Sequence, residues 1–164
     1  MNLLLFIMVL LNLFDCNQNE MKEVSKNGMT VRWELVKDSL QIEAFAPTQG
    51  WVAIGFNKSD ELKGTHLIMG CIQKGEVFIE EHYIRQPGDH IPISTLGGKD
   101  ALFNRTGIET KDGTHLSFQF PLKVADPYHW HLKPGKTYYL LLAYSESDDF
   151  YHHSRMRTSV KIQL

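Results

Sequence analysis

The sequence predicts an all-β protein, an antiparallel β-sandwich of about 9–11 strands. From Met29 onward, apolar and polar residues alternate with a period of two, which is typical of strands with one buried face. Clusters of turn-forming residues separate these short segments, and no window of eleven residues after position 28 shows the 3.6-residue apolar stripe of a helix. With 164 residues, of which 43% are hydrophobic and 22% charged, the chain has the size and composition of one globular domain.

The first three predicted strands show two different burial patterns. Residues 29–35 and 40–44 alternate between apolar and polar side chains, and Lys37-Asp38 between them provides a two-residue hairpin connection. Residues 51–56 are apolar at every position, which is expected of a strand that is covered on both faces.

Six further strands are predicted along the rest of the chain. They lie at residues 65–72, 76–84, 101–108, 114–120, 137–145 and 158–164. Turn sequences divide them, among them Gln73-Lys74-Gly75 and Lys133-Pro134-Gly135. Many short strands with regular turn signals indicate two antiparallel sheets that pack face to face.

The N-terminal segment differs from the rest of the chain. Residues 3–11 are all apolar, but nine helical residues rise only about 14 Å, less than half of a hydrocarbon core of roughly 30 Å. This predicts a signal peptide over residues 1–16 and an extracytoplasmic protein, secreted or anchored at the cell envelope. Cys16 stands where a bacterial lipoprotein carries its lipidated cysteine, so lipidation and simple cleavage both stay open. The polar residues 17–27 would tether a domain that begins at residue 28.

Charge and cysteine content narrow the possible functions. Seventeen Lys and Arg against nineteen Asp and Glu give a net charge of −2. The chain therefore lacks the excess of basic residues with which proteins bind nucleic acids, and the sequence does not favour that function. A lipid anchor is then the only expected route to a membrane. If Cys16 is lipidated or removed, Cys71 is the single remaining cysteine, so a disulfide framework is excluded. The apolar run at residues 67–72 predicts a buried, inert Cys71 thiol.

Residues 50–72 carry a more specific resemblance. The segment 50–57 (GWVAIGFN), a loop containing Gly64 and the strand 66–70 (HLIMG) resemble the centre of a DOMON domain. Similar downstream segments, such as 116–122 (LSFQFPL) and Tyr151-His152-His153, extend the resemblance over roughly residues 28–164. The resemblance implies an Ig-like β-sandwich that works outside the cytoplasm and binds haem or sugars. The family includes modules of dopamine β-monooxygenase-like proteins and the cytochrome of cellobiose dehydrogenase.

Haem-carrying members of this family use a methionine and a histidine as axial ligands of haem b. His152 or His153, just before the last strand, is the candidate histidine in this chain. The expected methionine position falls near Leu62, whose aliphatic side chain cannot ligate iron, so Met69 would have to point into the same pocket. The pocket is expected between the two sheets. A Met–His pair suits electron transfer, here with a membrane-bound redox partner.

Two other hypotheses stay open beside haem. A haem-free domain would bind a carbohydrate or a partner protein, and Trp130 and Tyr144 are the aromatic side chains expected to contact that ligand. Alternatively, His129 and His131 lie on one side of an extended segment. They would hold Cu or Zn in a metal-binding accessory protein if a third ligand came from elsewhere.

The sequence favours a binding protein over an enzyme. It contains no Gly-x-Ser-x-Gly elbow, no His-Glu-x-x-His pair and no glycine-rich phosphate loop. Glu80 and Glu81 are neighbours on a predicted strand, so they face opposite sides and cannot act as an acid/base pair across one substrate.

Overall fold

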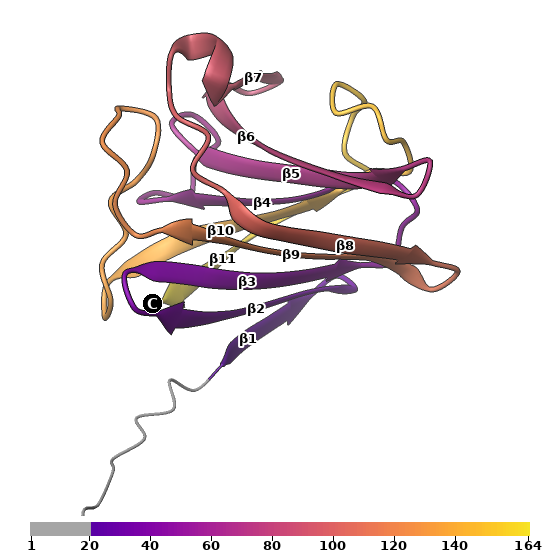
Figure 1. The fold of residues 1–164 in the computed structure, drawn as a ribbon, viewed down its shortest axis with the longest axis horizontal. Coiled ribbons are helices and arrows are strands. Elements are labelled where there is room, and N and C mark those ends of the chain that lie inside the picture. The colour runs from indigo at the N-terminus through magenta and orange to yellow at the C-terminus, as the bar shows by residue number, and fades with distance from the viewer. Residues whose placement is uncertain (1–20) are drawn as a thin grey trace, which may run out of the picture.

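The computed structural model describes residues 21–164 and consists of two antiparallel sheets packed face to face (Figure 1). One sheet has the strand order β1-β2-β3-β9-β8, and the other has the order β11-β10-β4-β5-β6-β7. The strands are β1 (Lys22–Lys26), β2 (Met29–Val36), β3 (Ser39–Ala46), β4 (Val52–Asn57), β5 (His66–Gln73), β6 (Glu76–Gln86), β7 (Asp89–Pro92), β8 (Phe103–Thr110), β9 (Gly113–Pro121), β10 (Thr137–Tyr144) and β11 (Met156–Gln163). The predicted antiparallel β-sandwich is confirmed.

The hairpin between β2 and β3 forms at the predicted place. Val36 pairs with Ser39 across it, and Lys37 adopts a φ of 56°, the left-handed conformation that such tight turns use. The resulting register places Trp33 opposite Ile42, and Ile42 in turn opposite Phe118 on β9. The turn sets the register of β2 and β3, and the separate pairing of β3 with β9 adds the apolar side chains of a third strand to the same face of the sheet.

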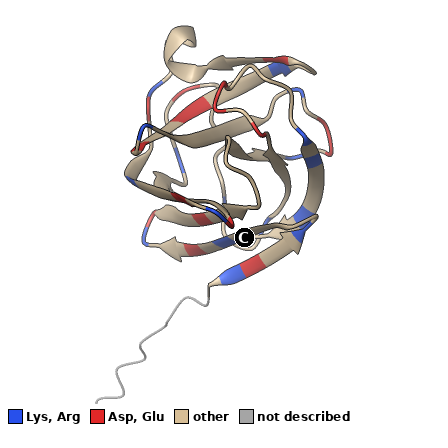
Figure 2. Ribbon diagram, turned by 90° about the vertical axis from the view of Figure 1, so that its right-hand side faces the viewer, with Lys and Arg blue, Asp and Glu red and all other residues tan. Residues whose placement is uncertain are grey.

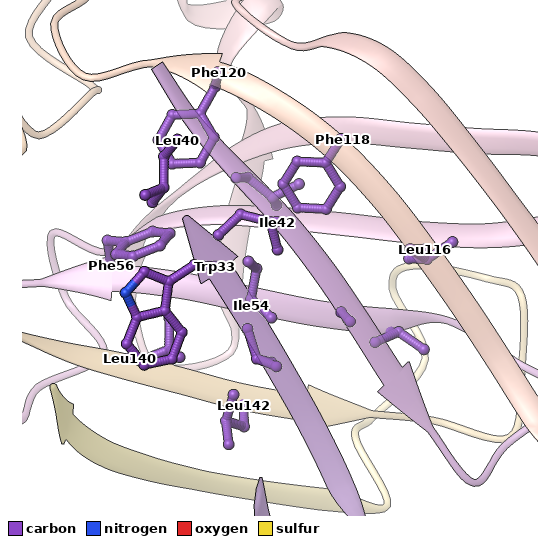
Figure 3. Packing of buried hydrophobic residues seen from close by; sticks show 14 of the residues in the cluster. Trp33, Leu40, Ile42, Ile54, Phe56, Leu116, Phe118, Phe120, Leu140 and Leu142 are labelled. Atoms are coloured by element: carbon purple, nitrogen blue, oxygen red, sulfur yellow. The ribbon is translucent and has the colours of Figure 1, made fainter. Parts of the chain in front are cut away.

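The space between the sheets is filled by side chains. Trp33, Ile42 and Phe118 from the five-stranded sheet pack against Ile54 and Leu140 from the six-stranded sheet (Figure 3). All five are buried. The expectation that a ligand pocket lies between the sheets is therefore wrong, because large aromatic and aliphatic side chains from both layers occupy that space.

The two central strands of the six-stranded sheet are buried on both faces. In β4 and β5 the residues with even numbers, such as Ile54 and Ile68, join the interior, which the apolar run at residues 51–56 predicted. Residues with odd numbers join a second apolar cluster on the opposite face. This outer cluster consists of Trp51, Ala53, Leu67, Met69, Cys71, Ile84 and Ala143, and loops cover it.

The predicted tether includes an edge strand, which corrects part of that prediction. Residues Lys22–Lys26 pair with β2 as β1, and Val24 packs against the interior. Lys22 and Lys26 also donate hydrogen bonds through Nζ to backbone carbonyls of β11, at 3.1 and 3.2 Å. An edge strand needs only one partner, so a polar sequence is sufficient for it. The predicted signal segment and Cys16 lie outside the described residues.

Two short elements near β6 have no counterpart in the prediction. β7 pairs with the end of β6, and a 3₁₀ turn over Ile93–Leu96 follows it. β7 is only four residues long and ends on Pro92, so it shows no period of two that would reveal it. Together they extend the six-stranded sheet beside the outer cluster.

Charged side chains are spread over the ribbon rather than gathered by sign. Segments with Lys or Arg and segments with Asp or Glu are interspersed over the ribbon (Figure 2). This distribution agrees with the absence of a basic excess in the sequence. In the described part of the chain, no helix has the length and apolar character needed to cross a bilayer.

Candidate ligand site

A cavity of about 130 Å³ lies on the outer face of the six-stranded sheet, and we call it the outer cavity. Apolar side chains from β4, β5, β6 and β10 form its floor, and polar side chains from β7, the β10–β11 loop and β11 form its rim. Its lining consists of Trp51, Ala53, Leu62, Leu67, Met69, Ile84, Gly88, Asp89, His90, Leu141, Ala143, Tyr151, His152, His153, Ser154 and Arg157. The outer cavity is thus an apolar pocket with a polar mouth.

The β10–β11 loop is tied down at the edge of this cavity. The amide of Trp51 donates to the carbonyl of Ser147, and the amide of Ser145 donates to the carbonyl of Trp51, both at 3.0 Å. Gly50 allows this close approach, because a Cβ there would meet the backbone nitrogen of Ser147 at 2.5 Å. The Ser145 hydroxyl then donates to the carbonyl of His153 at 3.0 Å. The Gly50-Trp51 pair noticed in the sequence therefore anchors the loop.

The outer cavity brings together three residues that the sequence singled out. Met69 comes from the floor, where it is buried, and His152 and His153 come from the loop, where both are exposed. Leu62, at the expected methionine position, lines the same cavity. Residues up to 91 positions apart thus share one pocket, on the outer side of the sheet and not between the sheets.

Two side chains of the lining, Trp51 and His90, stand out by their hydrogen-bond partners. The Trp51 side chain is 4% exposed, and its indole Nε1 has no hydrogen-bond partner among the described residues. His90 Nδ1 lies 3.0 Å from Nδ1 of the buried His82, and its ring stacks on Tyr151. Burial lowers the pKa of His90 and that of His82. Of the residues that line the outer cavity, Trp51 is thus the one with a buried, unsatisfied side-chain donor in the described part of the chain.

The lining does not fit a haem as the residues stand. Thioether and imidazole donors are both present, which is the right chemistry for haem iron. The volume of about 130 Å³, however, is below the roughly 300 Å³ at which pockets for drug-sized ligands begin, and a porphyrin is no smaller than such ligands. The Phe150 ring adds to the apolar packing above the floor, where it meets His82 edge-on at 6.0 Å.

Trp130 and Tyr144, the expected ligand-contacting aromatics, lie away from the outer cavity. Both are half-buried against the interior cluster. The Trp130 indole donates to the carbonyl of Gly64 at 3.1 Å, and Lys58 Nζ lies 4.3 Å from the centre of its ring. Tyr144 follows Ala143 on β10, so its side chain takes the opposite face of the sheet. The structure thus uses both rings in packing.

The structure separates His129 from His131. The exposed His131 has its Nε2 3.0 Å from the carbonyl of Val124. His129 is buried and belongs to a histidine–carboxylate cluster, which we define as His66, Glu81, Asp126 and His129. Among the described residues, only His129 of these two has further metal-ligating groups beside it. These are His66 on β5 and Glu81 on β6, not groups from the segment that carries His131.

Glu81 is the centre of the histidine–carboxylate cluster. Its Oε1 lies 2.9 Å from His66 Nε2 and 3.0 Å from His129 Nε2, and its Oε2 accepts a hydrogen bond from the Ala101 amide at 2.7 Å. On the far side of His129, Nδ1 lies 2.7 Å from Asp126 Oδ1. The cluster therefore joins β5, β6 and the loop after β9 through a continuous chain of polar contacts.

The two carboxylates determine the ionisation of the cluster. Burial disfavours charge on Glu81, but hydrogen bonds from His129 and His66 outweigh it and lower the pKa of Glu81 to about 2. Burial also opposes charge on His129, and its hydrogen bonds to Glu81 and Asp126 outweigh that effect and raise its pKa. The pKa of His66 is lowered because burial dominates there. The arrangement favours the neutral form of His66 and the charged form of His129 beside an ionised Glu81.

The sequence contained a signal for this cluster that we missed. Glu81 is in phase with Val77 and Ile79 on β6, so it occupies an inward-facing position where an apolar residue is expected. His66 is in phase with Ile68 in the same way. A charged residue in the apolar phase of a strand indicates a buried polar site, although its partner on the distant loop is not visible in the pattern.

Cys71 is expected to be unreactive in the folded protein. Burial, followed by the nearby charge of Asp148, raises the pKa of its thiol to about 11, so the thiolate fraction at pH 8 is about one in a thousand. In a Cys16→Ser variant, which leaves Cys71 as the only cysteine, Ellman's reagent should react slowly with native protein and at once in urea. Rapid labelling of the native variant would contradict this prediction.

Together, the fold and the outer cavity define a β-sandwich module with one sheet face covered by loops. The chain belongs to the DOMON domain family, whose family model matches residues 25–145. The predicted resemblance is confirmed. MOXD1 homolog 2 of Drosophila melanogaster is 26% identical over 118 residues, which are 72% of this chain and 15% of that protein. The chain thus spans about 15% of the length of this curated relative.

Solved structures show the same architecture at low sequence identity. The cytochrome b domain of pyranose dehydrogenase from Coprinopsis cinerea superposes with a TM-score of 0.67 at 8% identity, covering 87% of this chain and 81% of that chain. The cytochrome domain of Myriococcum thermophilum cellobiose dehydrogenase gives a TM-score of 0.55 at 10% identity, with coverages of 88% and 81%. These similarities establish the fold.

Proposed function

We propose that the chain is a non-catalytic, extracytoplasmic module that binds a small polyhydroxylated ligand, of the size of one sugar ring, in the outer cavity. The observation that carries the proposal is an apolar cavity of about 130 Å³ whose lining includes Trp51, a residue whose buried indole donor has no partner among the described residues. A buried donor costs free energy until an acceptor meets it, so a ligand with oxygen acceptors would remove that cost.

The composition of the lining supports the same ligand class. Ala53, Leu67 and Met69 offer an apolar floor to the flat face of a ring, and Asp89 and Arg157 bring charged groups to the rim. A largely apolar pocket with a few polar groups is the usual form of a small-molecule site. The N-terminal segment of the sequence supports a location outside the cytoplasm.

Haem b, with Met69 and His152 or His153 as ligands, is the competing hypothesis. The shared position of these residues favours it, and the small cavity and Leu62 argue against it. If haem were bound, the iron would supply one-electron chemistry and these side chains would hold it. We do not expect haem binding, because a cavity of about 130 Å³ is too small for a porphyrin.

The test is a titration of the full chain with glucose, galactose and N-acetylglucosamine, followed by calorimetry in every variant and, in the unmodified chain, also through the indole N–H signal of Trp51 by NMR. At least one sugar should shift that signal, and Trp51→Phe should weaken its binding about tenfold, because one hydrogen bond is worth roughly 0.5–1.5 kcal/mol. Phe45→Ala is the matched control. Phe45 lies in a separate, open groove of about 530 Å³ over the five-stranded sheet, so this variant should bind normally.

Three outcomes would overturn the proposal. A Trp51 signal that none of the three sugars moves removes the ligand class. Loss of binding in Phe45→Ala but not in Trp51→Phe moves the site to the groove. A Soret band after addition of haemin, lost in Met69→Leu or in one of the variants His152→Ala and His153→Ala, establishes the competing hypothesis.

A further inference from the structure

We propose that His66, Glu81 and His129 form a binding site for one divalent first-row transition metal ion, for which Zn²⁺ is the probe. The three side chains offer two imidazole nitrogens and one carboxylate oxygen, all within 4.8 Å of one another. Two histidines and one glutamate form a ligand set that zinc sites use, with a fourth position open to water. The site lies on the inner side of the six-stranded sheet and is independent of the outer cavity.

The two distances from the Glu81 oxygen to the histidine nitrogens are close to those between ligand atoms of a tetrahedral site. Zinc bonds of about 2.0–2.1 Å place ligand atoms about 3.3 Å apart. Glu81 Oε1 lies 2.9 Å from His66 Nε2 and 3.0 Å from His129 Nε2, so a small outward shift of the three groups makes room for the ion. The two imidazole rings have centres 4.6 Å apart and are inclined by 59°, so both nitrogens can face one point.

The groups behind the ligands have the arrangement that supports metal-bound side chains. Asp126 Oδ1 lies 2.7 Å from Nδ1 of His129, so it orients the ring and fixes Nε2 as the ligand atom. The Ala101 amide holds the second oxygen of Glu81 at 2.7 Å. Carboxylate–histidine–metal chains of this type raise the basicity of the ligand.

The burial and the donor atoms of the three ligands favour a transition metal ion, and a small cavity lies next to one of the ligands. All three ligands are buried, with side chains at most 2% exposed, so water competes little for the ion. Imidazole ligands favour Zn²⁺ and its first-row neighbours over Ca²⁺, which takes oxygen ligands. A small cavity of about 90 Å³ borders Glu81 and is lined by Ser94, Lys99 and Asp100 among others, and we expect the ion to enter from this side.

Calorimetric titration of the EDTA-stripped full chain with Zn²⁺ at pH 7.5 tests the proposal. One equivalent should bind, and Ca²⁺ should not displace it. Asp126→Asn should weaken binding about 10–100-fold, because it removes the orienting carboxylate and keeps the three ligands. Glu81→Gln should abolish binding. The combined variant His131→Ala/His152→Ala/His153→Ala, in which only exposed histidines change, is the matched control and should bind like the unmodified chain.

A second measurement identifies the ligands without changing any of them, in case Glu81→Gln does not fold. Imidazole ¹⁵N signals of the unmodified chain should shift on addition of Zn²⁺ for His66 and His129 only. Absence of binding would leave the cluster as a buried hydrogen-bond network and would overturn the proposal. Binding that disappears in the combined surface variant, or that moves the signals of exposed histidines instead, would overturn it as well.

Discussion

Glu81→Ala is expected to destabilise the folded chain by about 3–5 kcal/mol, measured by urea denaturation in buffer with EDTA. The carboxylate holds two buried histidines, and its removal leaves one of them charged beside Asp126 and the other without its partner. Removal of one member of a buried ion pair costs this much because the remaining group keeps its desolvation penalty. The thermal midpoint should fall by roughly 10 °C for a domain of this size.

The control for this variant is Glu76→Ala, on the same strand but exposed. It should change the stability by no more than about 0.5 kcal/mol. The effect of Glu81 also has a pH signature. Its pKa is about 2 in the folded chain against 4.5 ordinarily, so its stabilisation is present above pH 4.5 and disappears as the pH falls toward 2. A stability difference between the chain and Glu81→Ala that does not shrink over this range would contradict the assignment.

Phe118→Ala is expected to lower the free energy of unfolding by about 3–5 kcal/mol, because it removes a ring at the centre of the interior. Phe118 is 1% exposed and packs among Ile42, Phe120 and Leu116 (Figure 3). The loss combines the transfer free energy of the ring with the cavity that remains, because neighbours in two facing sheets cannot close around it. Urea denaturation at neutral pH gives the difference directly.

The matched control is Phe78→Ala, which removes the same ring from a side chain that is 45% exposed. We expect a loss of stability well below that of Phe118→Ala, because nearly half of the Phe78 side chain is already in water and its removal therefore loses less buried apolar surface. Similar costs at both positions would contradict the assignment of the space between the sheets as the main core.

Most of the fold could be predicted from local patterns. The alternation at residues 29–35 and 40–44, the Lys37-Asp38 turn and the fully apolar residues 51–56 correspond to β2, β3 and β4. These patterns are reliable because burial on one or both faces acts on each residue separately. β1 and β7 were missed because an edge strand is held by backbone hydrogen bonds to one neighbour, which any polar sequence can supply.

The candidate sites could be predicted only in part. Met69, His152 and His153 were linked through a family resemblance, and the structure places them in one cavity, but on the outer face. The side of the sheet could not be deduced, because β4 and β5 are apolar on both faces. The meeting of Asp126 with the cluster depends on the path of an irregular loop, and no periodic pattern reports such a path.

The double burial of β4 and β5 has a consequence for how this domain can diversify. Neighbouring residues on these strands serve different purposes, since one holds the layers together and the next shapes the outer cavity. A substitution at Ala53 or Met69 can therefore reshape the outer cavity without touching Ile54 or Ile68. Such a division lets evolution, or an engineer, change the cavity while the scaffold of the module stays constant.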